Sequence, residues 1–210
     1  MANTSRAPIA RPIVGGAIVG LVASIVMAMF AMIAALTYQG TGFFTPVYHI
    51  ASTLISADAM ETSMARAGQG SDFYFTVGPA LLGLLVHMMT GLIWGVVFGL
   101  IAWRVGLRGV AAPVVGIVFG LAVLVVDSFV FLPIAASLFG GGSRISDMPQ
   151  MVGWGTFTIE HVLYGIVVGL WPLLRPRDVS VAGRAGLAAT EARPRAALPA
   201  DLPIDDTARA

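Results

Sequence analysis

The chain has 210 residues, of which 57% are hydrophobic and 11% are charged, and its net charge is +1 at pH 7. A soluble domain carries about a quarter charged residues, so this composition is typical of an integral membrane protein, and it gives no support for a nucleic-acid partner. Cysteine is absent, which excludes disulfides, thiolate catalysis, iron–sulfur clusters and cysteine-ligated zinc.

Four apolar runs are long enough to cross the hydrocarbon core of a bilayer, at about 13–37, 77–103, 110–139 and 152–174. The first is longer than the core of a signal peptide, which is about 7–15 residues, so we expect it to remain as a span. Pro133 predicts a kink in the third run. The sequence predicts an all-α, four-helix transmembrane bundle over 13–174, a cytoplasmic N-terminus over 1–12 and a disordered cytoplasmic tail over 175–210.

Arginines indicate the orientation of these spans. They precede the first run, fill the short connection between the second and third, and follow the fourth: Arg6, Arg11, Arg104, Arg108, Arg175 and Arg177. The other two connections hold only Arg66 and Arg144. The positive-inside rule therefore predicts a multi-pass protein with both termini in the cytoplasm.

The first outer connection, about 38–76, contains a predicted short helix over about 46–57. Thr45 stands at its cap position and Pro46 at its first turn, and apolar residues follow at helical spacing. The helix is too short to span, so we expect it to lie at the outer interface. Two interpretations stay open for His49: its side chain faces water, or the helix is a lid over the bundle.

A glycine pattern recurs in the four runs. HMMTGLIWG (87–95) matches HVLYGIVVG (161–169), and GAIVG (16–20) matches GIVFG (116–120). The repetition predicts two tandem helical hairpins. Glycines four apart allow close helix packing: Gly16, Gly20, Gly91, Gly95, Gly116, Gly120, Gly165 and Gly169. The same faces also suit a homo-oligomer or a partner membrane protein.

Polar residues lie at similar depth in three of the runs. Counting from the arginines places His87, Asp127 and His161 in the outer half of the membrane, with Glu160 and Thr90 beside them. An unpaired charge there costs at least about 2.5–3.5 kcal/mol, so we expect Asp127 to face the two histidines. Asp127→Leu and His87→Leu are then expected to disturb the same property.

Three interpretations fit such a cluster. It is a polar core that fixes the pairing of two hairpins, a proton or ion relay, or a cofactor site. In the last case His87 and His161 are the axial ligands of a non-covalent haem b, or bind a divalent metal with Asp127 as the third ligand. No catalytic residue is assigned, because neither a Ser/His/Asp arrangement nor a phosphate loop nor a His-Glu-x-x-His motif is present. A non-enzymatic protein is favoured.

Four segments carry a resemblance: GFFTPVYHIAS, LLVHMMTGLIWGVVFG, VVDSFVFLP and IEHVLYGIVVG, in this order. Together they resemble a group of bacterial four-span membrane proteins that have a proline in the outer segment, a histidine in spans two and four, and Asn or Asp with a later proline in span three. The resemblance covers about 13–174. It implies a four-helix fold in the bacterial cytoplasmic membrane and supplies no established activity.

Overall fold

The computed structural model describes residues 9–174, and this part of the chain is helical, without a strand. The predicted tail at 175–210 and most of the predicted N-terminal segment, including Arg6, Arg175 and Arg177, lie outside the described residues. Three helical segments are long and apolar enough to cross a membrane: Ala10–Gln39, Val77–Arg104 and Ala111–Phe139.

The long helices begin and end within three residues of the predicted apolar runs. They are α1 (Ala10–Ala34) with its π-helical continuation η1 (Ala35–Gln39), α4 (Val77–Arg104), α5 (Ala111–Val126) continued by η2 (Asp127–Phe131) and α6 (Leu132–Phe139), and α9 (Trp154–Leu174). Their length follows from the long apolar runs, in which proline occurs only near the ends or next to a π-helical turn.

The outer connection differs from the prediction. The single helix predicted over 46–57 is wrong: α2 (Thr45–Ala51) ends early, and a separate helix α3 (Asp58–Ala67) follows. Two acidic residues, Asp58 and Glu61, lie in the first turn of α3, where they interact favourably with the positive end of the helix dipole. Two short helices, α7 (Ser143–Ser146) and α8 (Met148–Val152), precede α9.

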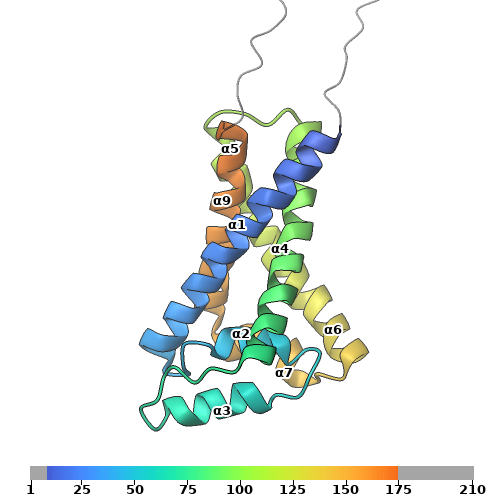
Figure 1. Cartoon of the computed structure of the whole chain (residues 1–210). Helices are drawn as coiled ribbons and strands as arrows, with labels where there is room; N and C mark the ends of the chain where they lie inside the picture. Colours follow the sequence, from blue (N-terminus) through green and yellow to red (C-terminus); the bar gives the residue numbers. More distant parts are fainter. Residues whose placement is uncertain (1–8, 175–210) are drawn as a thin grey trace, which may run out of the picture. The chain divides into compact units, whose positions relative to one another are not determined.

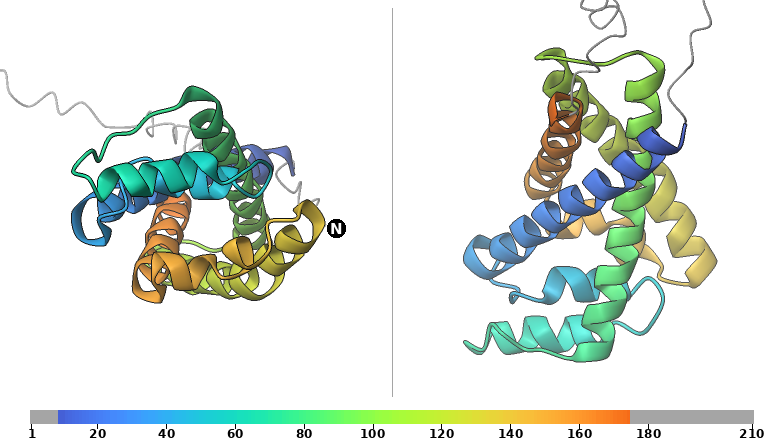
Figure 2. Two further views of the ribbon diagram at one scale, coloured as in Figure 1. Left: turned by 90° about the horizontal axis from the view of Figure 1, so that it is seen from below. Right: turned by 45° about the horizontal axis from the view of Figure 1, so that its top comes forward.

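The long helices pair in chain order. α1 packs along α4, and α5 packs along α9, while α1 also crosses α9 and joins the two pairs (Figure 1). Seen from the end that carries α2 and α3, the long helices surround a central region, and α2 packs across α4 (Figure 2). We call this end the α2–α3 end and the opposite one, with Arg104 and Arg108, the arginine end.

Glycines bring the first pair of helices into backbone contact. A β-carbon on Gly95 would stand 2.3 Å from the carbonyl oxygen of Gly16 and 2.5 Å from the Cα of Gly20. A β-carbon on Gly20 would stand 2.3 Å from the carbonyl oxygen of Gly91. No side chain fits at these distances, so α1 and α4 approach this closely only because glycine stands at both sides of the contact.

The second pair repeats this contact at the matching positions. A β-carbon on Gly116 would stand 2.2 Å from the carbonyl oxygen of Gly165 and 2.6 Å from the Cα of Gly169. A β-carbon on Gly120 would stand 2.2 Å from the carbonyl oxygen of His161. The eight glycines singled out in the sequence therefore form two glycine seams, one within each helical pair.

A π-helical turn interrupts the third long segment. Asp127 begins this turn, η2, and Pro133 follows as the second residue of α6. Proline has no backbone N–H for the carbonyl one turn earlier, and local π-helical geometry is one way in which a helix accommodates that loss. The disturbance predicted at Pro133 thus occurs as a wider turn that starts at Asp127.

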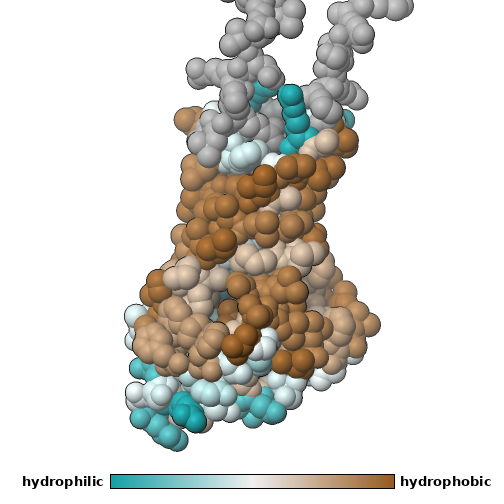
Figure 3. All heavy atoms as spheres, viewed as in Figure 1, coloured by the Kyte–Doolittle hydropathy of each residue, from teal (hydrophilic) through white to brown (hydrophobic). Residues whose placement is uncertain are grey.

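The surface of the long helices is apolar. Their exposed side chains are mostly aliphatic or aromatic, among them Ile18, Val22, Leu81, Leu85, Val114, Val118, Val125 and Phe129. Figure 3 shows this hydrophobic surface between hydrophilic residues at the α2–α3 end and at the arginine end. A contiguous apolar surface of this kind suits contact with lipid rather than with water.

Candidate functional site

A cavity of about 260 Å³ lies at the α2–α3 end, between α2 and the helices α1, α4, α6 and α9. Its wall is largely apolar and includes five methionines. All three histidines of the chain and two carboxylates also line it: His49, His87, His161, Asp127 and Glu160. Buried cavities with a few polar groups in an apolar wall are typical of small-molecule sites.

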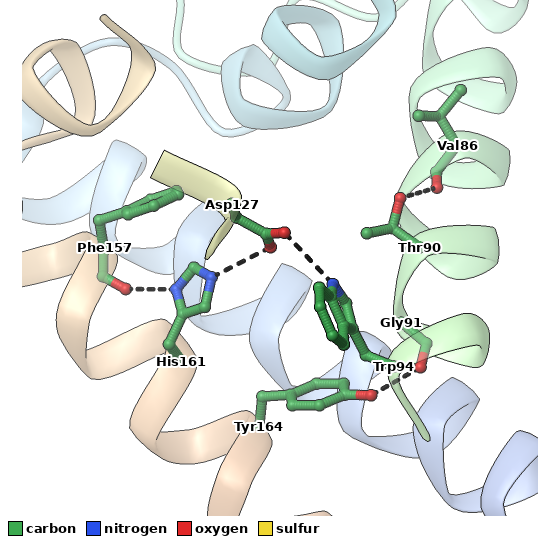
Figure 4. Close-up of polar contacts among 8 residues, drawn as sticks. All are labelled: Val86, Thr90, Gly91, Trp94, Asp127, Phe157, His161 and Tyr164. Carbon is green, nitrogen blue, oxygen red and sulfur yellow. Dashed lines mark hydrogen bonds and ion pairs between the residues drawn. The ribbon is translucent and has the colours of Figure 1, made fainter. Parts of the chain in front are cut away.

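Asp127 stands at the centre of the polar groups (Figure 4). Trp94 donates its indole N–H to the Oδ1 of Asp127 at 3.2 Å, and the Nε2 of His161 lies 3.6 Å from Oδ2. Three helices meet here, because Trp94 belongs to α4, Asp127 to η2 and His161 to α9. The prediction that Asp127 faces His161 is confirmed.

Two contacts orient the ring of His161. Its side chain is only 2% exposed, and its Nδ1 donates to the carbonyl oxygen of Phe157, one turn earlier, at 2.7 Å. Since a carbonyl oxygen only accepts, Nδ1 carries a hydrogen, and Nε2 is the ring nitrogen that faces Asp127.

Two aromatic residues link the helical pairs, and the sequence analysis missed both. Tyr164 of α9 donates its hydroxyl to the carbonyl oxygen of Gly91 in α4 at 2.6 Å, and Trp94 of α4 reaches Asp127. Their spacing from the histidines along the helices could have identified them. Trp94 follows His87 by seven residues and Tyr164 follows His161 by three, so each lies near the face of its histidine.

His87 is not hydrogen-bonded to Asp127. Its Nε2 donates to the carbonyl oxygen of Ser24 in α1 at 3.0 Å, within its own helical pair. His87, Asp127 and His161 do line a second, smaller cavity of about 50 Å³. The three-residue cluster predicted from depth is therefore an Asp127–His161 pair held by Trp94, with His87 nearby on a separate hydrogen bond.

The two remaining members of the predicted cluster occupy the wall of the larger cavity. Thr90 donates to the carbonyl oxygen of Val86 in its own helix at 3.0 Å. Glu160 is only 5% exposed, and its Oε1 has no hydrogen-bond partner. A buried carboxylate oxygen without a partner is rare in folded proteins and calls for an explanation from function.

His49 is buried, so the interpretation that places it in water is wrong. Its side chain is 5% exposed, lines the cavity and donates from Nε2 to the carbonyl oxygen of Arg144 at 2.9 Å. Burial lowers the pKa of His49 below its ordinary value, which favours the neutral ring. The hydrogen bond through Nε2 leaves Nδ1 as an acceptor. α2 thus forms one wall of the cavity, as a lid would.

The arrangement does not favour a metal or haem. Among residues 9–174, no group of three or more His, Asp and Glu side chains is placed to hold a metal ion. His87 and His161 each use one ring nitrogen on a backbone carbonyl, and the Nε2 of His161 faces Asp127. Both histidines line the larger cavity of about 260 Å³ as well as the smaller one of about 50 Å³, and the smaller one has room only for water.

No protein-family model, curated protein or solved structure matches the chain.

Proposed function

We propose that the protein spans the bacterial cytoplasmic membrane four times, with both termini inside. Three segments meet the length and hydropathy of a span, and α9 is the candidate for the fourth. α9 has 21 residues and packs against α1 and α5. Its three ionisable side chains, Glu160, His161 and Tyr164, are buried inside the bundle, so they do not prevent its outer face from contacting lipid.

The absence of cysteine allows a direct test of this topology. We expect a membrane-impermeant maleimide to label Ser71→Cys, between α3 and α4, in intact cells. Val110→Cys, 90% exposed between α4 and α5, should react only after the cells are broken. The cysteine-free parent is the control. Labelling of Val110→Cys in intact cells would contradict the proposed orientation.

For the role of the polar groups, we infer a non-enzymatic polar core that holds the two hairpins together in the membrane. The observation that carries this inference is a pair of hydrogen bonds between the hairpins, from Trp94 of α4 to Asp127 and from Tyr164 of α9 to the carbonyl oxygen of Gly91 in α4. A polar group that is satisfied inside the bundle favours the associated state of the hairpins, because hydrocarbon offers it no partner.

A proton relay across the membrane is less well supported. On the arginine side of the Asp127–His161 pair, the buried core consists of Val19, Ala23, Phe98, Ala102, Tyr164 and Val168. Tyr164 already donates its proton to Gly91, and the other members are apolar. The described residues therefore provide polar groups for local proton exchange but no continuous path to the arginine end.

A double-mutant cycle tests the core. We expect Asp127→Leu and Trp94→Leu, which share the hydrogen bond between the hairpins, to be non-additive in the free energy of unfolding by roughly 0.5–3 kcal/mol. The same holds for Asp127→Leu and His161→Leu, which share a contact within the second hairpin. Asp127→Leu and His87→Leu should add to within about 0.5 kcal/mol, because His87 binds Ser24 instead. The measurement is reversible denaturation in detergent. Equal coupling for both histidines would instead support the three-residue cluster predicted from sequence.

A further inference from the structure

The ionisable groups in the wall of the larger cavity are carboxyls and histidines, and the wall also includes the amide of Gln39 and the hydroxyls of four threonines, Thr41, Thr45, Thr53 and Thr90. Asp127 and Glu160 supply carboxyl groups. His49 and His87 each donate one ring N–H to a backbone carbonyl, so the other ring nitrogen is an acceptor when the ring is neutral. The residues that line the cavity include no arginine, and the chain contains no lysine. A complementary ligand therefore supplies hydrogen-bond donors.

The two carboxyl groups in the described wall of the cavity differ in their contacts. Asp127 accepts a hydrogen bond from Trp94 and lies 3.6 Å from His161. Glu160 has no such partner: its side chain is 5% exposed, and its Oε1 accepts no hydrogen bond. Glu160 is thus a buried carboxyl group without a hydrogen-bond partner in the cavity wall, and a cationic donor would pair with its ionised form.

The rest of the wall suits an apolar body of modest size. Methionines Met27, Met60, Met64, Met148 and Met151 line it together with aliphatic and aromatic side chains. Methionine side chains are flexible and polarizable, so they adapt to ligands of varied shape. The volume of about 260 Å³ lies just below the roughly 300–1,000 Å³ of typical small-molecule sites, which suits a small ligand.

We propose that this cavity binds a small hydrophobic amine, whose ammonium group donates to Glu160 and whose apolar part lies against the methionines. This site is distinct from the structural role of the Asp127–His161 pair, because Glu160 takes no part in that pair. The helix α2, whose His49 lines the cavity, covers the bound amine at the α2–α3 end of the bundle. Hydrocarbons and carboxylates fit the same space but leave Glu160 without a donor, and an alcohol offers it a donor without a positive charge.

Calorimetric titration tests the proposal with three probes of similar shape. The protein is placed in nanodiscs of zwitterionic lipid, and empty nanodiscs give the background from partition into lipid. We expect 2-phenylethylamine to bind at least about tenfold more tightly than 2-phenylethanol, as one charge-assisted hydrogen bond predicts. 3-Phenylpropionate should bind more weakly still. Equal affinity for amine and alcohol, or no amine binding, would overturn the proposal.

Two variants assign the binding to Glu160 and to this cavity. Glu160→Gln keeps the shape of the side chain, and we expect it to reduce amine affinity to that of the alcohol. Glu61→Gln is the matched control, since the side chain of Glu61 is 68% exposed, and amine affinity should not change. Ala135→Phe, which reduces the space at the wall formed by α6, should weaken the binding of both amine and alcohol. Unchanged amine affinity in folded Glu160→Gln would refute the assignment.

Discussion

Replacing Gly95 with alanine should lower the free energy of unfolding by roughly 1–3 kcal/mol, the usual cost of forcing extra volume into a packed contact. The new β-carbon would stand 2.3 Å from the carbonyl oxygen of Gly16 and 2.5 Å from the Cα of Gly20. Both atoms belong to the backbone of α1, so no side chain can move aside. At roughly 2–4 °C per kcal/mol, the melting temperature in detergent should fall by about 2–12 °C.

The same helix provides the control. A β-carbon on Gly78 would meet no atom within 4 Å, so Gly78→Ala should leave stability unchanged or raise it by up to about 1 kcal/mol, the helix preference of alanine over glycine. A drop in Gly78→Ala as large as that in Gly95→Ala would mean that any alanine in α4 is harmful. The loss of stability in Gly95→Ala would then not be caused by the glycine seam.

Asp127→Leu should cost about 3–5 kcal/mol, the range for removal of one partner from a buried pair. Leucine accepts no hydrogen bond, so both the indole N–H of Trp94 and the Nε2 of His161 lose their partner. Asp127→Asn should cost only about 1 kcal/mol, because its amide oxygen accepts from Trp94 and its amide nitrogen donates to a neutral His161. Thermal unfolding of the three proteins in one detergent measures the difference.

The comparison of these two variants separates hydrogen bonding from charge. If Asp127→Asn is as unstable as Asp127→Leu, a charged pair rather than the hydrogen bonds stabilises the contact. If Asp127→Leu unfolds at the temperature of the unmodified protein, the hydrogen bond from Trp94 to Asp127 contributes nothing to the association of the hairpins, and the polar-core proposal is wrong.

The long helices could be predicted because each coincides with an apolar run whose ends are polar or contain proline. The two helices of the outer connection, α2 and α3, could not be predicted in the same way. Leu54 and Ile55 extend the apolar spacing of the predicted outer helix, yet both are exposed in the structure, where α2 has already ended. α3 has no comparable apolar run, and its place is set by packing against α2 that the local sequence does not encode.

The depth of the site residues along their helices could be predicted, but the direction in which their side chains point could be predicted less well. Counting along straight helices correctly placed Asp127 near His161. Which face a residue takes depends on helical phase, and the π-helical turn η2 changes that phase for Phe131 and the residues of α6 that line the cavity. The hydrogen bond from His87 to Ser24 depends on the distance between α1 and α4, which glycine contacts determine and spacing alone does not give.

The glycine seams bear on the order in which the protein assembles during synthesis. Each seam joins two long helices that are consecutive in the chain, α1 with α4 and α5 with α9. The first hairpin therefore has all its seam contacts before α5 leaves the ribosome. The bonds from Trp94 to Asp127 and from Tyr164 to Gly91 need both hairpins, so they form last. Insertion can proceed as two local packing steps, and the directional polar contacts then select the one correct docking of two finished hairpins.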